Sequence, residues 1–140
     1  MSDNKLHVYL YLPGTVRQAF TLYQQVFGVP LAPFPAMPNT NMITYGDMGM
    51  TGGEQASLIA YAALDFGNML LMAGDKPGLM QPTEPAMRLH YAADSRQHAE
   101  QLFNQLARSG QIDMPLGEQP WGYSGQCTDQ FGVAWELSVR

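Results

Sequence analysis

Residues 128–139 read Thr128-Asp129-Gln130-Phe131-Gly132-Val133-Ala134-Trp135-Glu136-Leu137-Ser138-Val139. The Asp-x-Phe-Gly part is typical of a tight turn, in which Gly132 is suited to a positive φ. The residues after it alternate between apolar and small or polar side chains, which predicts the second strand of a hairpin. In that strand Glu136 lies on the opposite face from Val133, Trp135 and Leu137. We therefore expect Trp135 in the core, and Glu136 as either an exposed charge or a functional group that faces a cavity.

The first half of the chain predicts a strand, a helix and three further strands. Residues 6–12 alternate strictly, so His7, Tyr9 and Tyr11 share one face of the first strand. Thr15 and Gln18 have the spacing of a capping box, and apolar residues recur at helical spacing after them. We expect the remaining strands at residues 42–45, 57–66 and 68–73, with a hairpin turn at residues 67–68 and a mobile loop over residues 33–55.

The second half repeats this order. Asp94 and Gln97 predict the start of a second helix, and Gly110 its end. The strands are expected at residues 86–92, 112–116, 123–128 and 133–139. Each half is too small to close a core well. We therefore expect one domain, residues 1–140, in which a module of about residues 5–75 packs beside one of about residues 85–140.

Composition limits the possible partners. The net charge is −5, and the 7 Lys and Arg residues are scattered over 140 residues, which disfavours nucleic acid and anionic membranes as partners. Without a signal peptide pattern or an apolar run of about 20 residues, the expected location is cytoplasmic. The single cysteine, Cys127, is expected to be a small strand residue without chemistry. The charged fraction of 14% and the 10 methionines favour a homodimer.

Several segments resemble one known family. They are Ala19-Phe20-Thr21-Leu22-Tyr23-Gln24-Gln25-Val26-Phe27-Gly28, Ile43-Thr44-Tyr45-Gly46-Asp47-Met48, Trp121-Gly122-Tyr123 and the quoted residues 128–137. Together they resemble the vicinal oxygen chelate superfamily, which includes glyoxalase I, extradiol dioxygenases and the fosfomycin and bleomycin resistance proteins, and within it the PhnB-like branch. The resemblance implies an α+β fold: two βαβββ modules form a curved open sheet around a cavity, with the helices on the outer face, usually in a homodimer.

The resemblance also implies candidate metal ligands. Metal-dependent members place ligands on the first and last strands of each module, and two of these positions match His7 and Glu136. The third falls at about Leu70 or Leu71, neither of which can bind a metal, and the fourth falls at Arg88, a fixed cation.

Three readings of this departure remain open. His7, His90 and Glu136 would make a two-histidine, one-carboxylate set for a divalent Fe, Mn, Ni or Zn ion. Alternatively, Glu136 forms an ion pair with Arg88, or serves as a general acid or base without a metal.

The candidate cavity is expected to hold a small molecule. Its lining would include Tyr9, Tyr11, Arg88 and His90, whereas Trp121 and Tyr123 would either touch the ligand or simply pack. Glycine-rich phosphate loops and the common hydrolase motifs are missing from the sequence. Three hypotheses follow: a PhnB-like small-molecule binding protein, a metal-dependent glyoxalase or dioxygenase-type enzyme with Glu136 and His7 as catalytic residues, and a non-catalytic resistance-type sequestering protein.

Overall fold

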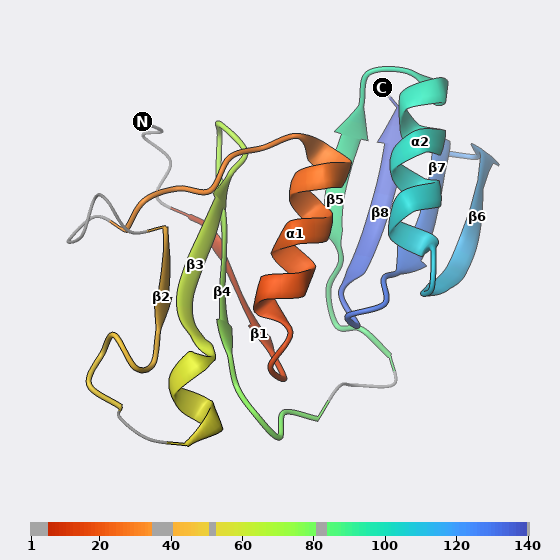
Figure 1. The fold of residues 1–140 in the computed structure, drawn as a ribbon. Helices are drawn as coiled ribbons and strands as arrows, with labels where there is room; N and C mark the ends of the chain where they lie inside the picture. Colours follow the sequence, from red (N-terminus) through yellow and green to blue (C-terminus); the bar gives the residue numbers. More distant parts are fainter. Residues whose placement is uncertain (1–5, 35–40, 51–52, 81–83, 140) are drawn as a thin grey trace. The chain divides into compact units, whose positions relative to one another are not determined.

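The computed structural model describes residues 6–34, 41–50, 53–80 and 84–139, and the chain divides into two compact units, residues 1–80 and 81–140. Each unit contains one long helix and a four-stranded mixed sheet, in the predicted order βαβββ (Figure 1). No helix among these described residues is both long and apolar enough to span a membrane.

The first unit is built on a sheet with the strand order β1-β4-β3-β2. β1 pairs with β4 in parallel, and the other neighbours are antiparallel. Its elements are β1 (Val8–Leu12), α1 (Val16–Phe27), β2 (Met42–Thr44), the short 3-10 helix η1 (Glu54–Ser57), β3 (Ile59–Asp65) and β4 (Leu70–Asp75). The predicted strand at residues 42–45 is therefore confirmed, while part of the predicted loop, residues 35–40 and 51–52, lies outside the described residues.

Helix α1 covers one face of this sheet and buries the apolar side chains that the helical spacing predicted (Figure 1). Val16, Ala19, Phe20 and Tyr23 are all fully buried. The helix ends at Phe27, and Gly28 is its C-cap residue with a φ of 65°. The opposite face of the sheet carries Tyr9 and Tyr11, because neighbouring side chains of a strand point to opposite faces.

The capping box predicted for α1 is wrong. Thr15 is the N-cap residue, but its side chain makes no capping hydrogen bond. Instead, the Val16 N–H donates to Asp75 Oδ1 at 3.0 Å, and the Ile59 N–H donates to Asp75 Oδ2 at 2.8 Å. Asp75 is the last residue of β4, so the tertiary fold brings a stronger acceptor to the helix start than the local Thr15 hydroxyl.

The second unit has the strand order β5-β8-β7-β6, again with one parallel pair, β5 with β8. Its elements are β5 (Leu89–Ala93), α2 (Arg96–Ala107), β6 (Gln111–Gln119), β7 (Gly122–Thr128) and β8 (Ala134–Val139). Helix α2 packs on β7 and β8 (Figure 1). Trp135 and Leu137 are buried, which confirms the core face of the last strand. The α2 cap is Ser95, which accepts from the His98 N–H at 3.0 Å, so the predicted capping residue Asp94 is one position too early.

The turn that opens β8 has the predicted form. Gly132 adopts a φ of 85°, and its N–H donates to the Asp129 carbonyl at 3.0 Å. The Asp129 carboxylate accepts from the backbone N–H groups of Phe131 and Val133, at 2.9 and 3.1 Å. Its second oxygen accepts from the Trp135 indole at 2.9 Å. The turn is thereby tied to the core of the sheet.

Candidate functional site

Polar side chains gather on the face of the second sheet that α2 does not cover. The strand register pairs His90 with Glu136, Gln126 with Glu136, and Ser124 with Ser138. Directly paired residues point to the same face of a sheet. These five side chains therefore lie on one face, opposite the buried Trp135 and Leu137.

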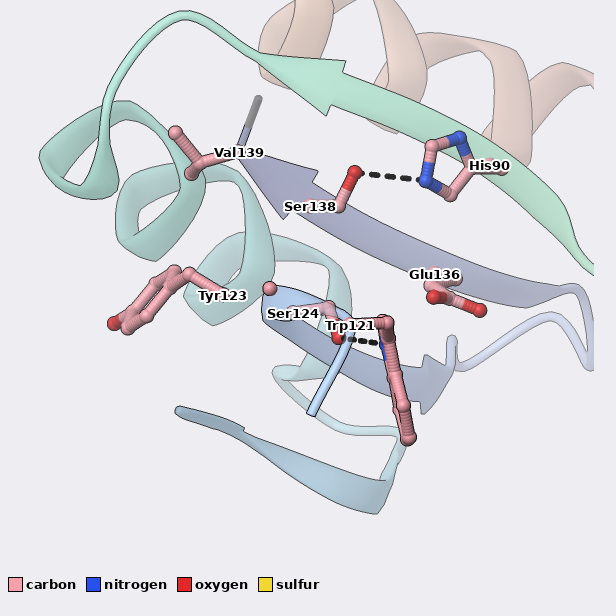
Figure 2. Close-up of a pocket in the computed structure, with 8 residues that line it drawn as sticks. His90, Trp121, Tyr123, Ser124, Glu136, Ser138 and Val139 are labelled. Atoms are coloured by element: carbon pink, nitrogen blue, oxygen red, sulfur yellow. Dashed lines mark hydrogen bonds between the residues drawn. The ribbon is translucent and has the colours of Figure 1, made fainter. Parts of the chain in front are cut away.

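A pocket of about 240 Å³ lies over this polar face. Figure 2 shows His90, Glu136 and Ser138 projecting from β5 and β8, and the Trp121 indole standing over β7. Trp121 comes from the hairpin between β6 and β7. The residues that line the pocket are His90, Trp121, Gly122, Tyr123, Ser124, Glu136, Ser138 and Val139.

Short hydrogen bonds orient the pocket side chains. His90 Nε2 lies 2.8 Å from Ser138 Oγ, and the Gln126 amide donates to Glu136 Oε1 at 3.2 Å. The Trp121 indole N–H donates to Ser124 Oγ at 2.9 Å (Figure 2). A carboxylate with two oxygens and an imidazole can accept, donate and transfer protons to a bound molecule. The pocket therefore combines hydrogen-bonding groups with one aromatic surface.

Arg88 does not form the ion pair with Glu136 that was one reading of the sequence. Its Nη1 donates to Asp113 Oδ2 at 3.0 Å and to the backbone carbonyls of Cys127 and Trp135 at 3.2 and 3.4 Å. The strand register explains this, because Glu136 pairs with His90, which lies two residues after Arg88 in the sequence. Arg88 instead reaches across the sheet toward β6.

Asp113 is held as a carboxylate in this pair. Burial alone would raise the pKa of Asp113, but hydrogen bonds from Gln111, Thr128 and Arg88, together with the Arg88 charge, outweigh it and lower that pKa. The Arg88 charge is therefore neutralised by Asp113 and not by Glu136.

Tyr123 packs against α2, which was one of the two predicted roles for it. The Arg96 guanidinium lies over the Tyr123 ring at 4.5 Å, and the Tyr123 hydroxyl donates to Glu100 Oε1 at 3.4 Å. Figure 2 shows the ring pointing away from His90, Glu136 and Trp121. Tyr123 thus forms the edge of the pocket rather than its centre.

The other predicted site residues, His7, Tyr9 and Tyr11, belong to the first unit. The Tyr9 and Tyr11 rings lie 5.2 Å apart. Burial, followed by the neighbouring tyrosines, raises the pKa of Tyr9, so its hydroxyl stays protonated and donates to the Ala60 carbonyl at 3.0 Å. Gly74 leaves room for this bond, because a Cβ there would lie 2.8 Å from the Tyr9 hydroxyl oxygen.

His7 is bound to the backbone of the same sheet. Its Nδ1 accepts from the Leu70 N–H at 2.9 Å. A neutral imidazole that accepts through Nδ1 carries its proton on Nε2, where no lone pair remains for a metal. His7 therefore accepts a hydrogen bond through Nδ1 and can donate one through its Nε2–H.

The matching registers of the two sheets correct the predicted counterpart of Glu136. Val8 pairs with Leu71 in the first sheet, and Leu89 pairs with Trp135 in the second. Counting one residue further, the pair Tyr9–Met72 corresponds to the pair His90–Glu136. The first-module counterpart of Glu136 is therefore Met72, not Leu70 or Leu71.

These residues do not fit a divalent metal ion. The positions that correspond to one another are His7 with Arg88 and Met72 with Glu136, so a guanidinium and a thioether stand in place of two ligands. Among the described residues, no three His, Cys, Asp or Glu side chains form a group that could hold a metal.

Cys127 is a small buried residue of β7. It is fully buried, and burial, followed by the charges of Asp129 and Asp113, raises the pKa of its thiol to about 12. The reactive thiolate is therefore scarce at neutral pH.

The sequence interpretation missed the polar pocket residues Ser124 and Ser138, and also Gln126, which bonds to the pocket residue Glu136. A signal for them was present in the alternation. Ser138 lies two residues after Glu136, and Ser124 and Gln126 are two residues apart on the preceding strand, so each shares the Glu136 face once the register is known.

Residues 5–137 match the family model of the Glyoxalase/Bleomycin resistance protein/Dioxygenase superfamily. The chain belongs to this superfamily. The vicinal oxygen chelate resemblance seen in the sequence is thereby confirmed, as is the α+β fold of two βαβββ modules.

Relatives within the superfamily span the whole chain. The structure of protein PA1353 from Pseudomonas aeruginosa is 32% identical, covers 99% of this chain and 98% of its own, and superposes with a TM-score of 0.82. The PhnB protein of Bacillus cereus is 23% identical over 98% of this chain and 100% of its own, with a TM-score of 0.79. Protein YjdN of Escherichia coli K12 is 24% identical over 96% of this chain and 94% of its own.

Proposed function

We propose that this superfamily member binds a small molecule in the pocket of its second unit, without requiring a metal ion. One observation carries the proposal: His90 and Glu136 are direct partners in the sheet and line the same pocket as the exposed Trp121 ring. Ligand pockets typically combine apolar or aromatic surface with a few placed polar groups. This pocket has that composition.

Four residues of the pocket, and their neighbour Gln126, have distinct roles in the proposal. Glu136 and His90 form hydrogen bonds to the ligand, and Trp121 stacks on its planar part. Gln126 and Ser138 are positioning residues, because their bonds to Glu136 and His90 orient those two side chains. Turnover would need proton transfer by Glu136 or His90, and their positions on neighbouring strands permit it.

Binding can be tested by NMR, because the two tryptophans report on different places. Trp121 is 66% exposed in the pocket, whereas Trp135 is 3% exposed in the core. We expect two-ring aromatic compounds to shift the indole N–H signal of Trp121 and to leave that of Trp135 in place. Trp121→Ala, for which binding is followed from the ligand's own NMR signals, should weaken binding about fivefold to tenfold, because one aromatic contact is lost.

The matched control for this titration is Tyr11→Ala. Tyr11 is also an exposed aromatic residue, but it lies in the first unit. The proposal is wrong if no compound shifts the Trp121 signal, or if Tyr11→Ala weakens binding as much as Trp121→Ala does.

The metal-dependent alternative is tested by elemental analysis of protein purified without chelators or affinity-tag metal. We expect no stoichiometric Fe, Mn, Ni or Zn after supplementation with each, because the corresponding positions hold Met72 and Arg88. One equivalent of metal that is lost in both His7→Ala and Glu136→Ala would support the enzyme hypothesis instead.

We also propose a homodimer, for which the low charged fraction and the exposed side chains of Tyr11 and Met48 are the support. Equilibrium sedimentation would give the mass, and a monomer at micromolar concentration would contradict this proposal.

A further inference from the structure

We propose that the ligand class of this pocket is a planar cation: an aromatic ring that carries an amidinium, guanidinium or similar N–H-rich positive group. The proposal rests on the proposed function and specifies it. The ring would stack on Trp121, and the cationic group would donate to the Glu136 carboxylate.

The first argument is that Glu136 has no cation beside it among residues 84–139. Its one side-chain partner in that range is the neutral amide of Gln126. A carboxylate that is partly removed from water and lacks a counter-charge is costly, and a bound cation removes much of that cost. Glu136 therefore favours a positively charged group.

Two arginines of the same unit pair with groups other than Glu136, and Arg140 lies outside the described residues. Arg88 pairs with Asp113, and Arg96 pairs with Glu118 and lies over the Tyr123 ring. Arg108 directly follows α2, on the side of the sheet away from the pocket. Residues 81–140 contain four arginines, no lysine and seven carboxylates, which gives a formal charge of −3. The electrostatic field of this unit thus attracts cations and repels anions.

The second argument is the state of Trp121. Its indole N–H is already bonded to Ser124 Oγ, so the ring is held in place and offers its face rather than a donor. That face is open, because the side chain is 66% exposed. Tryptophan is the best aromatic partner for a cation, and its face also stacks on planar rings. A planar cation would stack on the Trp121 ring and pair its charge with the Glu136 carboxylate at the same time.

The third argument concerns the remaining pocket groups. His90 and Ser138 bond to each other, and neither carries a fixed charge. An anionic ligand would therefore find no fixed positive charge within the described part of the pocket and would face Glu136. A neutral planar ligand would use the stacking surface but leave the carboxylate without a counter-charge.

The test compares three probes that have the same two rings and differ in charge: 2-naphthamidinium, 2-naphthamide and 2-naphthoate. Dissociation constants would be measured from the Trp121 indole N–H shift on the full chain at low ionic strength, because salt screens such interactions. We expect 2-naphthamidinium to bind at least about tenfold more tightly than either other probe, since it alone makes a charge-assisted hydrogen bond.

Glu136→Gln should remove this preference, because glutamine keeps the shape of the side chain and loses its charge. The matched control, Glu84→Gln, removes one charge from an exposed residue of the same unit outside the pocket and should leave the preference intact. Trp121→Ala, for which binding is followed from the ligand's own NMR signals, should weaken the binding of 2-naphthamidinium and 2-naphthamide, since both lose the stacking surface.

The outcomes separate this inference from the proposed function. The cation proposal is overturned if 2-naphthamide or 2-naphthoate binds as tightly as 2-naphthamidinium, or if Glu136→Gln leaves the preference unchanged. In both cases the pocket still binds a small molecule, so the proposed function stands. If none of the three probes shifts Trp121, both proposals are wrong.

Discussion

Replacing Asp129 by alanine is expected to lower the free energy of unfolding by about 3–5 kcal/mol. The Asp129 side chain is 3% exposed, and its carboxylate accepts from two backbone N–H groups and from the Trp135 indole. A buried donor that loses its acceptor costs about 1–3 kcal/mol, and three donors would lose theirs at once. Urea unfolding followed by circular dichroism measures the change.

Two variants identify the cause of the Asp129 effect. Trp135→Phe removes one of the three donors together with a small part of the ring, so it should cost clearly less than Asp129→Ala. Asp94→Ala removes a carboxylate that is 95% exposed, and it should change the free energy of unfolding by less than about 0.5 kcal/mol. If Asp129→Ala is as mild as Asp94→Ala, the carboxylate does not hold the turn.

Replacing Asp75 by alanine is expected to cost about 2–4 kcal/mol in the first unit. Its carboxylate is 2% exposed and joins three elements, because the end of β4 accepts from the first N–H of α1 and from the first N–H of β3. Alanine would leave both N–H groups buried without an acceptor. The same unfolding experiment measures the loss.

Thr15→Ala is the matched comparison for Asp75→Ala. If Thr15 were the capping residue that the sequence predicted, its loss would cost about 1 kcal/mol. The structure shows that the Thr15 hydroxyl is buried without a hydrogen-bond partner among the described residues, so Thr15→Ala should cost little. A larger loss for Thr15→Ala than for Asp75→Ala would contradict the capping role of Asp75.

The order of elements could be predicted because its signals are local. Strict alternation at residues 6–12 and helical spacing after Thr15 lie within short windows, and so does the turn at Gly132. The helix caps could not be predicted equally well. Asp75 is about 60 residues from the helix it caps, and in α2 two neighbouring residues, Asp94 and Ser95, are both good capping residues.

The candidate site was predicted in part. Alternation placed Glu136 on the face opposite Trp135, the resemblance implied His90 as a candidate ligand, and the structure brings these two residues together in one pocket. The partner of Arg88 was predicted wrongly, because Asp113 lies on β6 and the pairing depends on strand register across the sheet. His7, Tyr9 and Tyr11 lie in the first unit, so their role together with Glu136 stays a prediction.

The sequence by itself determined which residues form strands and helices, which face of each strand is buried, and to which superfamily the chain belongs. The strands, helices and buried faces depend on neighbours within a few positions along the chain, where periodicity and turn chemistry act, and the superfamily follows from several short motifs spread over the chain. Only the tertiary structure decided which polar groups meet. It paired Glu136 with Gln126, Arg88 with Asp113, and Asp75 with α1, because hydrogen bonds and ion pairs form between atoms that the sheet register brings within about 3 Å.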